Sequence, residues 1–209
     1  MSKTLLSIMI IAGVVIVFVL GRYTGLDTDQ FSTSPNEGVQ EAPSESEFDA
    51  WVVFQPDDNS FSVSFPRKPA HISEKAHDAF GLSPKNYNIY AADGLDKKGY
   101  MLEVITFPEG PNPATDTQIL ENTLKDIISH STLNTLEESK EETFKGNKAL
   151  SFKIDSGERK LQGVIFVLNE TLFVLTRVSP DDYAGESQDY KFFIQSFKPK
   201  KNSNNKDPL

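Results

Sequence analysis

The sequence predicts an α+β domain, an antiparallel β-sheet flanked by helices, that follows one N-terminal transmembrane helix. Three observations support this fold class. Short apolar segments recur between turn-forming residues, two later segments carry apolar residues at helical spacing, and the chain opens with a long uncharged run. A mainly antiparallel sheet covered by helices is the economical arrangement for such elements.

The uncharged run spans residues 4–21, between Lys3 and Arg22. As a helix it would be about 27 Å long, close to the hydrocarbon thickness of a bilayer. We therefore expect an uncleaved signal anchor; a cleaved signal peptide, whose apolar stretch is usually about 7–15 residues, is the alternative. The positive charge before the run, with Asp27 and Asp29 after it, favours an N-terminus in the cytoplasm. We expect a single-pass protein of the inner or plasma membrane with an extracytoplasmic domain.

Three further segments are expected after the cytoplasmic tip and anchor, which together cover residues 1–21. Residues 22–47 carry six acids and one arginine among Gly, Ser, Thr and Pro, so we interpret them as a disordered acidic linker. Residues 48–198 form the α+β domain, and residues 199–209 are a disordered polar tail.

The domain begins with predicted strands at residues 50–56 and 61–65. In the second of them, Phe61, Val63 and Phe65 share one face, and the two serines between them take the other. Further strands are predicted at residues 85–92, 100–107, 135–144, 148–155, 161–168 and 172–178.

The composition of the later strands indicates their places in the sheet. Residues 135–144 are polar enough for an edge strand. Residues 161–168 and 172–178 are apolar on both faces, which favours central strands covered on both sides. The sequence NET at residues 169–171 joins these two as a tight hairpin candidate.

Two segments have helical spacing. Residues 116–131 place apolar side chains along one face, and Thr115 or Asp116 is the candidate N-cap. Residues 179–197 form the second predicted helix. Its packing stripe at i, i+3, i+4 and i+7 consists of Tyr190, Phe193, Ile194 and Phe197.

Composition excludes several classes of function. The chain has no cysteine, so it has no disulfide, thiol nucleophile, thiolate metal site or lipoprotein anchor. Its formal net charge is -9, which argues against nucleic-acid binding because such a chain repels phosphate backbones.

Three motifs resemble the PsbP-like superfamily. They are F-x-V-x-F-P-x-x-P at residues 61–69, G-x-x-A-L-x-F at residues 146–152, and the closing FFIQSFK at residues 192–198. The resemblance covers residues 48–198 and implies an α-β-α sandwich around an antiparallel sheet, used mainly for protein binding and assembly. It supplies no functional residues, because members of the superfamily share a fold far more than a site.

Arg67 and Lys68 lie between two prolines directly after the strand at residues 61–65. Because Pro66 and Pro69 cannot donate ladder hydrogen bonds, they end the strand and stiffen its exit. We interpret the two basic residues as solvated loop residues; a dedicated anion site is the alternative.

His71, Glu74, His77 and Asp78 form the densest group of metal-ligand types. In an extended strand the Cα atoms of the two histidines would lie about 20 Å apart, too far for one ion. We therefore expect surface histidines here, and a metal site only if a loop brings them together.

The remaining reactive residue types have ordinary explanations. His130 ends the first predicted helix, where an imidazole suits the helix dipole, and neither flanking serine lies in a nucleophile motif. The acidic pairs at residues 137–138, 141–142 and 181–182 are expected on a solvated face.

Arg177 is the residue whose surroundings discriminate most between functions. It interrupts an apolar strand and alternates with Phe173 and Leu175 on one face. We expect it to reach solvent near the end of the strand. In the other reading it pairs with a buried carboxylate, as in an active site assembled from residues distant in sequence.

These observations favour a membrane-anchored, non-enzymatic binding or assembly module with a protein partner at or near the membrane. A small-ligand or metal-binding protein that uses the same domain is the alternative. No catalytic, cofactor-binding or metal-ligating residue is assigned, and no cofactor is expected.

Overall fold

The computed structural model describes residues 48–77, 84–95, 97–107, 115–157, 159–180 and 187–200. The transmembrane helix predicted at residues 4–21 and the linker predicted at residues 22–47 lie outside these ranges. Within them, no helix is long and apolar enough to cross a bilayer. The described residues from Ala50 onwards belong to one compact unit, which contains the elements below.

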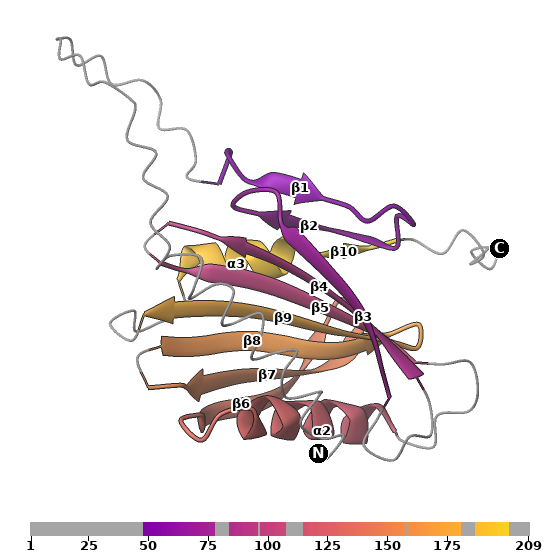
Figure 1. Cartoon of the computed structure of the whole chain (residues 1–209), viewed down its shortest axis with the longest axis vertical. Coiled ribbons are helices and arrows are strands. Elements are labelled where there is room, and N and C mark those ends of the chain that lie inside the picture. Colours follow the sequence, from indigo (N-terminus) through magenta and orange to yellow (C-terminus); the bar gives the residue numbers. More distant parts are fainter. Residues whose placement is uncertain are drawn as a thin grey trace, which may run out of the picture. The chain divides into compact units, whose positions relative to one another are not determined.

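Seven of the described strands form one antiparallel sheet (Figure 1). In spatial order they are β3 (Ala70–His77), β4 (Pro84–Asp93), β5 (Gly99–Thr106), β9 (Thr171–Pro180), β8 (Arg159–Leu168), β7 (Asn147–Asp155) and β6 (Thr135–Phe144). The sheet therefore consists of two meanders, β3 to β5 and β6 to β9, that meet where β5 pairs with β9. Strand β6 is an edge, with the bounds that the sequence predicted.

Helix α2 (Asp116–Ser129) covers one face of the sheet, over β7 and β8. It begins with a capping box, in which the Thr115 hydroxyl accepts from the Gln118 backbone and the Gln118 side chain accepts from the Thr115 backbone. Thr115 is thus the N-cap, one of the two residues proposed from the sequence. The buried Leu120 and Leu124 belong to the core on this face.

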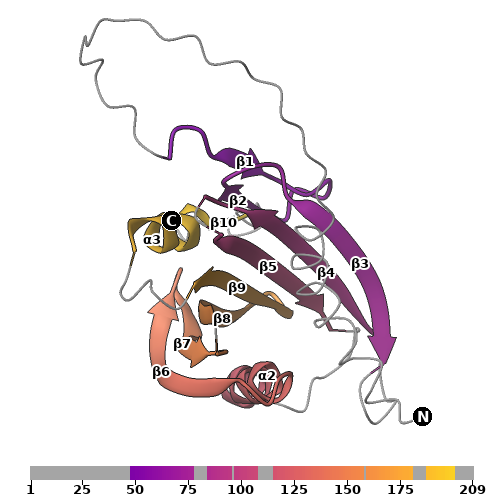
Figure 2. The same cartoon turned by 60° about the vertical axis from the view of Figure 1, so that its left-hand side comes forward.

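The opposite face is covered by a second helix and a small sheet. These elements are α3 (Gln188–Ser196) and the antiparallel strands β1 (Val52–Phe54), β2 (Phe61–Phe65) and β10 (Lys198–Pro199). The core on this side is largely aromatic, and Phe61, Phe193 and Phe197 are each at most 3% exposed. Figure 2 shows α2 and α3 against different parts of the large sheet, and β6 runs from α2 towards α3. The predicted class, an antiparallel sheet with flanking helices, is confirmed; the small sheet was not predicted.

The tight hairpin predicted at residues 169–171 joins β8 and β9, and its turn consists of two residues because Thr171 already belongs to β9. Asn169 and Glu170 have φ of 49° and 59°, the left-handed conformation that matches the twist of the two strands. Both strands lie inside the sheet, as their apolar faces indicated.

The start of the second helix was predicted too early. Ser179 and Pro180 still belong to β9, where Ser179 pairs with Lys160, and α3 begins only at Gln188. The cause is the long β8–β9 ladder, which keeps this part of the chain extended. Residues 181–186 lie outside the described residues.

Two strands were not predicted. The polar sequence of β3 gives no apolar stripe, yet β3 pairs with β4 from Ala70 to His77 along the other edge of the sheet. Strand β10 includes Pro199, one residue inside the predicted tail, because the chain pairs with Phe61 and Ser62 after α3.

The basic loop at residues 66–69 connects β2 in the small sheet with β3 in the large one. Arg67 and Lys68 are exposed, as expected for a strand exit. Arg67 also forms an ion pair with Asp93 at the end of β4. The loop therefore carries the chain from one sheet to the other.

Candidate functional site

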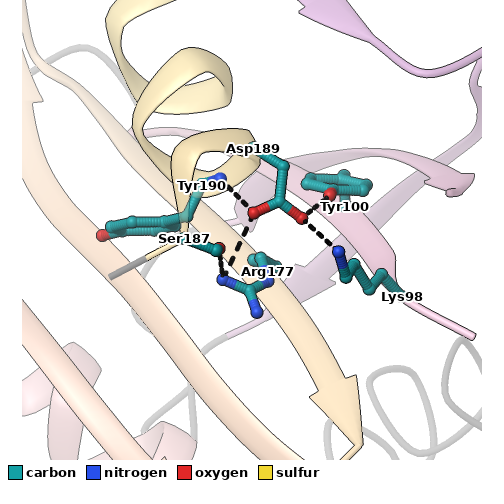
Figure 3. A network of polar contacts seen from close by, with 6 residues as sticks. All are labelled: Lys98, Tyr100, Arg177, Ser187, Asp189 and Tyr190. Atoms are coloured by element: carbon teal, nitrogen blue, oxygen red, sulfur yellow. Dashed lines mark hydrogen bonds and ion pairs between the residues drawn. The ribbon is translucent and has the colours of Figure 1, made fainter. Parts of the chain in front are cut away.

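A cluster of ionised side chains is buried where α3 lies on the large sheet (Figure 3). At its centre is the carboxylate of Asp189, in the first turn of α3. Arg177 reaches it from β9, and Lys98 and Tyr100 from the start of β5. These four residues, with Ser187 at the N-cap of α3, are called the α3 cluster below.

The contacts of the α3 cluster are short and specific. The Asp189 Oδ2 atom accepts a hydrogen bond of 2.6 Å from the Tyr100 hydroxyl and lies 3.0 Å from the Lys98 Nζ atom. The Oδ1 atom accepts from the Tyr190 backbone at 2.8 Å and lies 3.7 Å from the Arg177 Nη1 atom. Arg177 also donates to the Ser187 hydroxyl.

The backbone explains why these side chains converge. Phe173, Leu175 and Arg177 alternate along one face of β9, and that face is the one covered by α3. Lys98 is placed by a tight loop after β4, closed by a hydrogen bond of 2.9 Å from the Gly94 N–H to the Lys98 carbonyl. Asp189 lies two turns before Phe197 on the buried side of α3.

The expectation that Arg177 reaches solvent is wrong. Its side chain is 2% exposed, and it pairs with Asp189, which is 6% exposed as a residue. Arg177 is buried because α3 covers the end of β9, which would otherwise be exposed to solvent. The alternative reading, a pair with a buried carboxylate, is the correct one.

The electrostatics of the cluster keep Asp189 ionised. Burial alone would raise the pKa of its carboxyl group, but hydrogen bonds from Ser187, Tyr100 and Lys98, together with the charge of Arg177, outweigh it and lower the pKa to about 2. A carboxylate with so low a pKa is a poor proton donor or acceptor at neutral pH. The cluster is suited to hold α3 on the sheet.

One polar row runs from this cluster to the open edge of the sheet. The strand register places Tyr100 opposite Arg177, Arg177 opposite Gln162, Gln162 opposite Lys153, and Lys153 opposite Glu138. The row is buried at Arg177 and exposed at Glu138, on β6. It thus connects the cluster beneath α3 with a charged surface.

That surface is hollowed into an open groove of about 290 Å³ between α3 and strands β6 to β8. Its outer wall is formed by alternate residues of β6, namely Glu138, Lys140 and Glu142. The floor and the inner wall are formed by Ser151, Phe152, Lys153, Gln162, Val164, Tyr190, Lys191, Ile194 and Gln195. This is called the α3–β6 groove below.

A second buried carboxylate lies on the opposite face of the sheet. Glu103 of β5 stands opposite Ile89 and Val174 and is 6% exposed. Burial raises the pKa of its carboxyl group from 4.5 to about 7.

The structure does not bring the histidines of β3 together. Because β3 is extended from Ala70 to His77, the Cα atoms of His71 and His77 are separated by about 20 Å. The His71 ring instead stacks on Tyr90, with 4.5 Å between ring centroids. The side chains of Glu74 and His77, and the whole of Asp78, lie outside the described residues, which contain no group of three metal-ligand side chains.

His130 is the C-cap residue of α2, and its ring contacts the Asp126 carbonyl, which fits the helix-end interpretation. Glu137 and Glu138 form ion pairs with Lys160 and Lys153 across the sheet, and β6 is exposed over nearly its whole length. The pair at residues 181–182 lies outside the described residues.

The sequence identified Arg177 but not the other members of the α3 cluster, Lys98, Tyr100 and Asp189. One signal was available for Asp189. It lies four residues before Phe193 and eight before Phe197, so this acidic residue shares the apolar face of the predicted helix. Lys98 lies between the strands predicted at residues 85–92 and 100–107, and Tyr100 begins the second of them; neither carries such a signal.

The fold and site define an α+β domain with a helix on each face of its main sheet and a closed ion cluster beneath one of them. The chain is similar in structure to cyanobacterial PsbP (CyanoP) from Synechocystis sp. PCC 6803, with 11% identity, a TM-score of 0.46, and coverage of 78% of this chain and 98% of that chain. It is also similar to the protein of unknown function PA94 from Pseudomonas aeruginosa, with 11% identity, a TM-score of 0.33, and coverage of 63% and 84%. No family model and no curated protein matches the sequence.

A PsbP protein is thus among the solved structures to which this chain is similar, as the three sequence motifs led us to expect. The similarity concerns the fold. No function and no residue's role is drawn from it.

Proposed function

We propose that the chain is a membrane-anchored binding and assembly module, without enzymatic activity, whose domain meets a protein partner outside the cytoplasm. The observation that carries the proposal is the contrast between the two polar regions of the domain. The α3 cluster is buried and its carboxylate is occupied by neighbouring donors, whereas the α3–β6 groove is open and charged. A closed cluster stabilises a fold, and an open charged surface beside an edge strand suits recognition.

Sequence supports the membrane part of the proposal. The uncharged run at residues 4–21 has the length of a bilayer span, and the acidic run at residues 22–47 has the composition of a flexible linker. A flexible chain of that length has a root-mean-square reach of roughly 28 Å. The domain would then be held near the membrane and be free to meet a neighbouring protein.

Crosslinking in cells tests this function. With the full-length protein we expect one dominant partner from the membrane or the extracytoplasmic space, identified by mass spectrometry. The same partner should be lost when residues 4–21 are deleted, and its yield should fall when residues 22–47 are shortened by half. Full capture by the form without residues 4–21 would contradict the anchored module.

A small-ligand-binding protein is the second candidate, and the size of the groove favours it. About 290 Å³ is close to the lower end of the range of about 300–1,000 Å³ typical of ligand pockets. This candidate predicts a ligand-dependent rise in the melting temperature without any captured protein.

A further inference from the structure

Strand β6 has a free edge that is regular enough to pair with another strand. Its ladder with β7 runs without interruption from Glu138 to Phe144, and the one irregularity lies before Glu138. In the described sheet β6 has β7 as its neighbour on one side, and the opposite edge is open. Nine of its ten residues are exposed. The backbone groups along this edge can therefore accept an added strand.

The same strand forms the outer wall of the α3–β6 groove. Because side chains alternate along a strand, Glu138, Lys140 and Glu142 all face the groove. In a strand added beside β6, alternate side chains would stand directly opposite these three. Backbone pairing and side-chain recognition would thus occur at one place.

The charge order along this wall is acidic, basic, acidic. Glu138 is paired with Lys153 at 2.7 Å, whereas Lys140 and Glu142 form no ion pair within the described part of the chain. Charged edges usually discourage pairing between identical or apolar strands. A fixed order of charges also selects a partner, since opposite charges across strands stabilise a pair and like charges destabilise it.

We propose that the free edge of β6 binds an extended segment of a partner protein whose groove-facing side chains are basic, acidic and basic in turn. The net charge of -9 on the chain favours such a partner, because two of its three facing charges are positive. The proposal rests on the proposed function and specifies where and how the module binds.

Designed peptides test the charge order directly. The probes are labelled peptides with the sequences TKVEVKVT, TEVKVEVT and TKVKVKVT, titrated against the full-length protein in detergent micelles by fluorescence anisotropy. The parent protein should bind TKVEVKVT at least about tenfold more tightly than TEVKVEVT. Hydrogen exchange should slow at β6 amides that face away from β7.

Charge reversal at Lys140 supplies the decisive comparison. The Lys140→Glu variant should bind TKVEVKVT roughly five- to tenfold more weakly than the parent protein does. It should bind TKVKVKVT more tightly than TKVEVKVT. The control Lys148→Glu makes the same charge change on the other face of the sheet, where Lys148 contacts Glu141 and Thr117, and should leave the peptide order unchanged.

Equal effects of the two variants, absence of charge discrimination, or no binding of any peptide would overturn the proposal. A partner captured in cells and retained in full by Lys140→Glu would also overturn it, while leaving the proposed function intact. Charge-ordered peptide binding without any captured partner would support this binding mode and count against the proposed cellular function.

Discussion

Asp189→Asn is expected to lower the free energy of unfolding by about 3–5 kcal/mol, because it removes a buried negative charge that both Lys98 and Arg177 contact beneath α3. Asparagine keeps the shape of the side chain, so the effect measures charge and hydrogen bonding rather than a cavity. Both basic side chains are at most 7% exposed and cannot recover their hydration without moving α3. Urea unfolding of parent and variant, followed by circular dichroism, gives the difference.

A matched control comes from an exposed pair. Glu141→Gln removes the partner of Lys148 on the surface, where the two side chains are 61% and 41% exposed, and should change the free energy of unfolding by less than about 1 kcal/mol. Combining Asp189→Asn with Lys98→Met should recover part of the loss, since the buried lysine charge that Asp189 contacts is then absent as well. Equal losses from Asp189→Asn and Glu141→Gln would show that the α3 cluster does not hold the helix.

Glu103→Gln is expected to remove a loss of stability that the parent protein suffers as the pH rises. The pKa of Glu103 is raised to about 7 by burial, so the folded state binds its proton more tightly than the unfolded chain does. The resulting stabilisation is fully present below pH 4.5 and is lost as the pH rises through 7. Since each pKa unit corresponds to about 1.4 kcal/mol, the loss amounts to about 3 kcal/mol by pH 8–9.

The measurement is urea unfolding of parent and Glu103→Gln at pH 5 and pH 8.5. Other titrating groups contribute equally to both proteins, so the difference between the two pH dependences isolates Glu103. Asp189 does not interfere, because its lowered pKa places its own titration below pH 4. Parallel pH dependences would mean that Glu103 is accessible to water in the folded protein.

The sequence was most informative where the composition of a whole segment indicates its place in the sheet. Strand β6 was predicted with its observed bounds, because ten mostly polar residues fit an edge that solvent reaches on both sides. The β8–β9 hairpin was predicted from two apolar runs around Asn169 and Glu170. Edge strand β3 was missed because its polar residues carry no apolar alternation.

The candidate site was harder to predict for a physical reason. Asp189 and Lys98 meet only because β5 pairs with β9 and α3 folds back over both strands. The α3–β6 groove likewise depends on a helix and three strands that become neighbours through the register of the sheet. Local patterns identify Arg177 as unusual, whereas its partner follows from the tertiary arrangement.

Photo-crosslinking from a single position tests whether the open groove, rather than the buried cluster, is the binding surface of the module. A photo-reactive phenylalanine analogue is placed at Lys140, beside the groove, or at Val53, an exposed residue of β1. The full-length protein carrying it is irradiated in cells. We expect position 140 to capture the partner and position 53 not to capture it. Capture from position 53 alone, or equal capture from both, would show that the groove is not the binding surface.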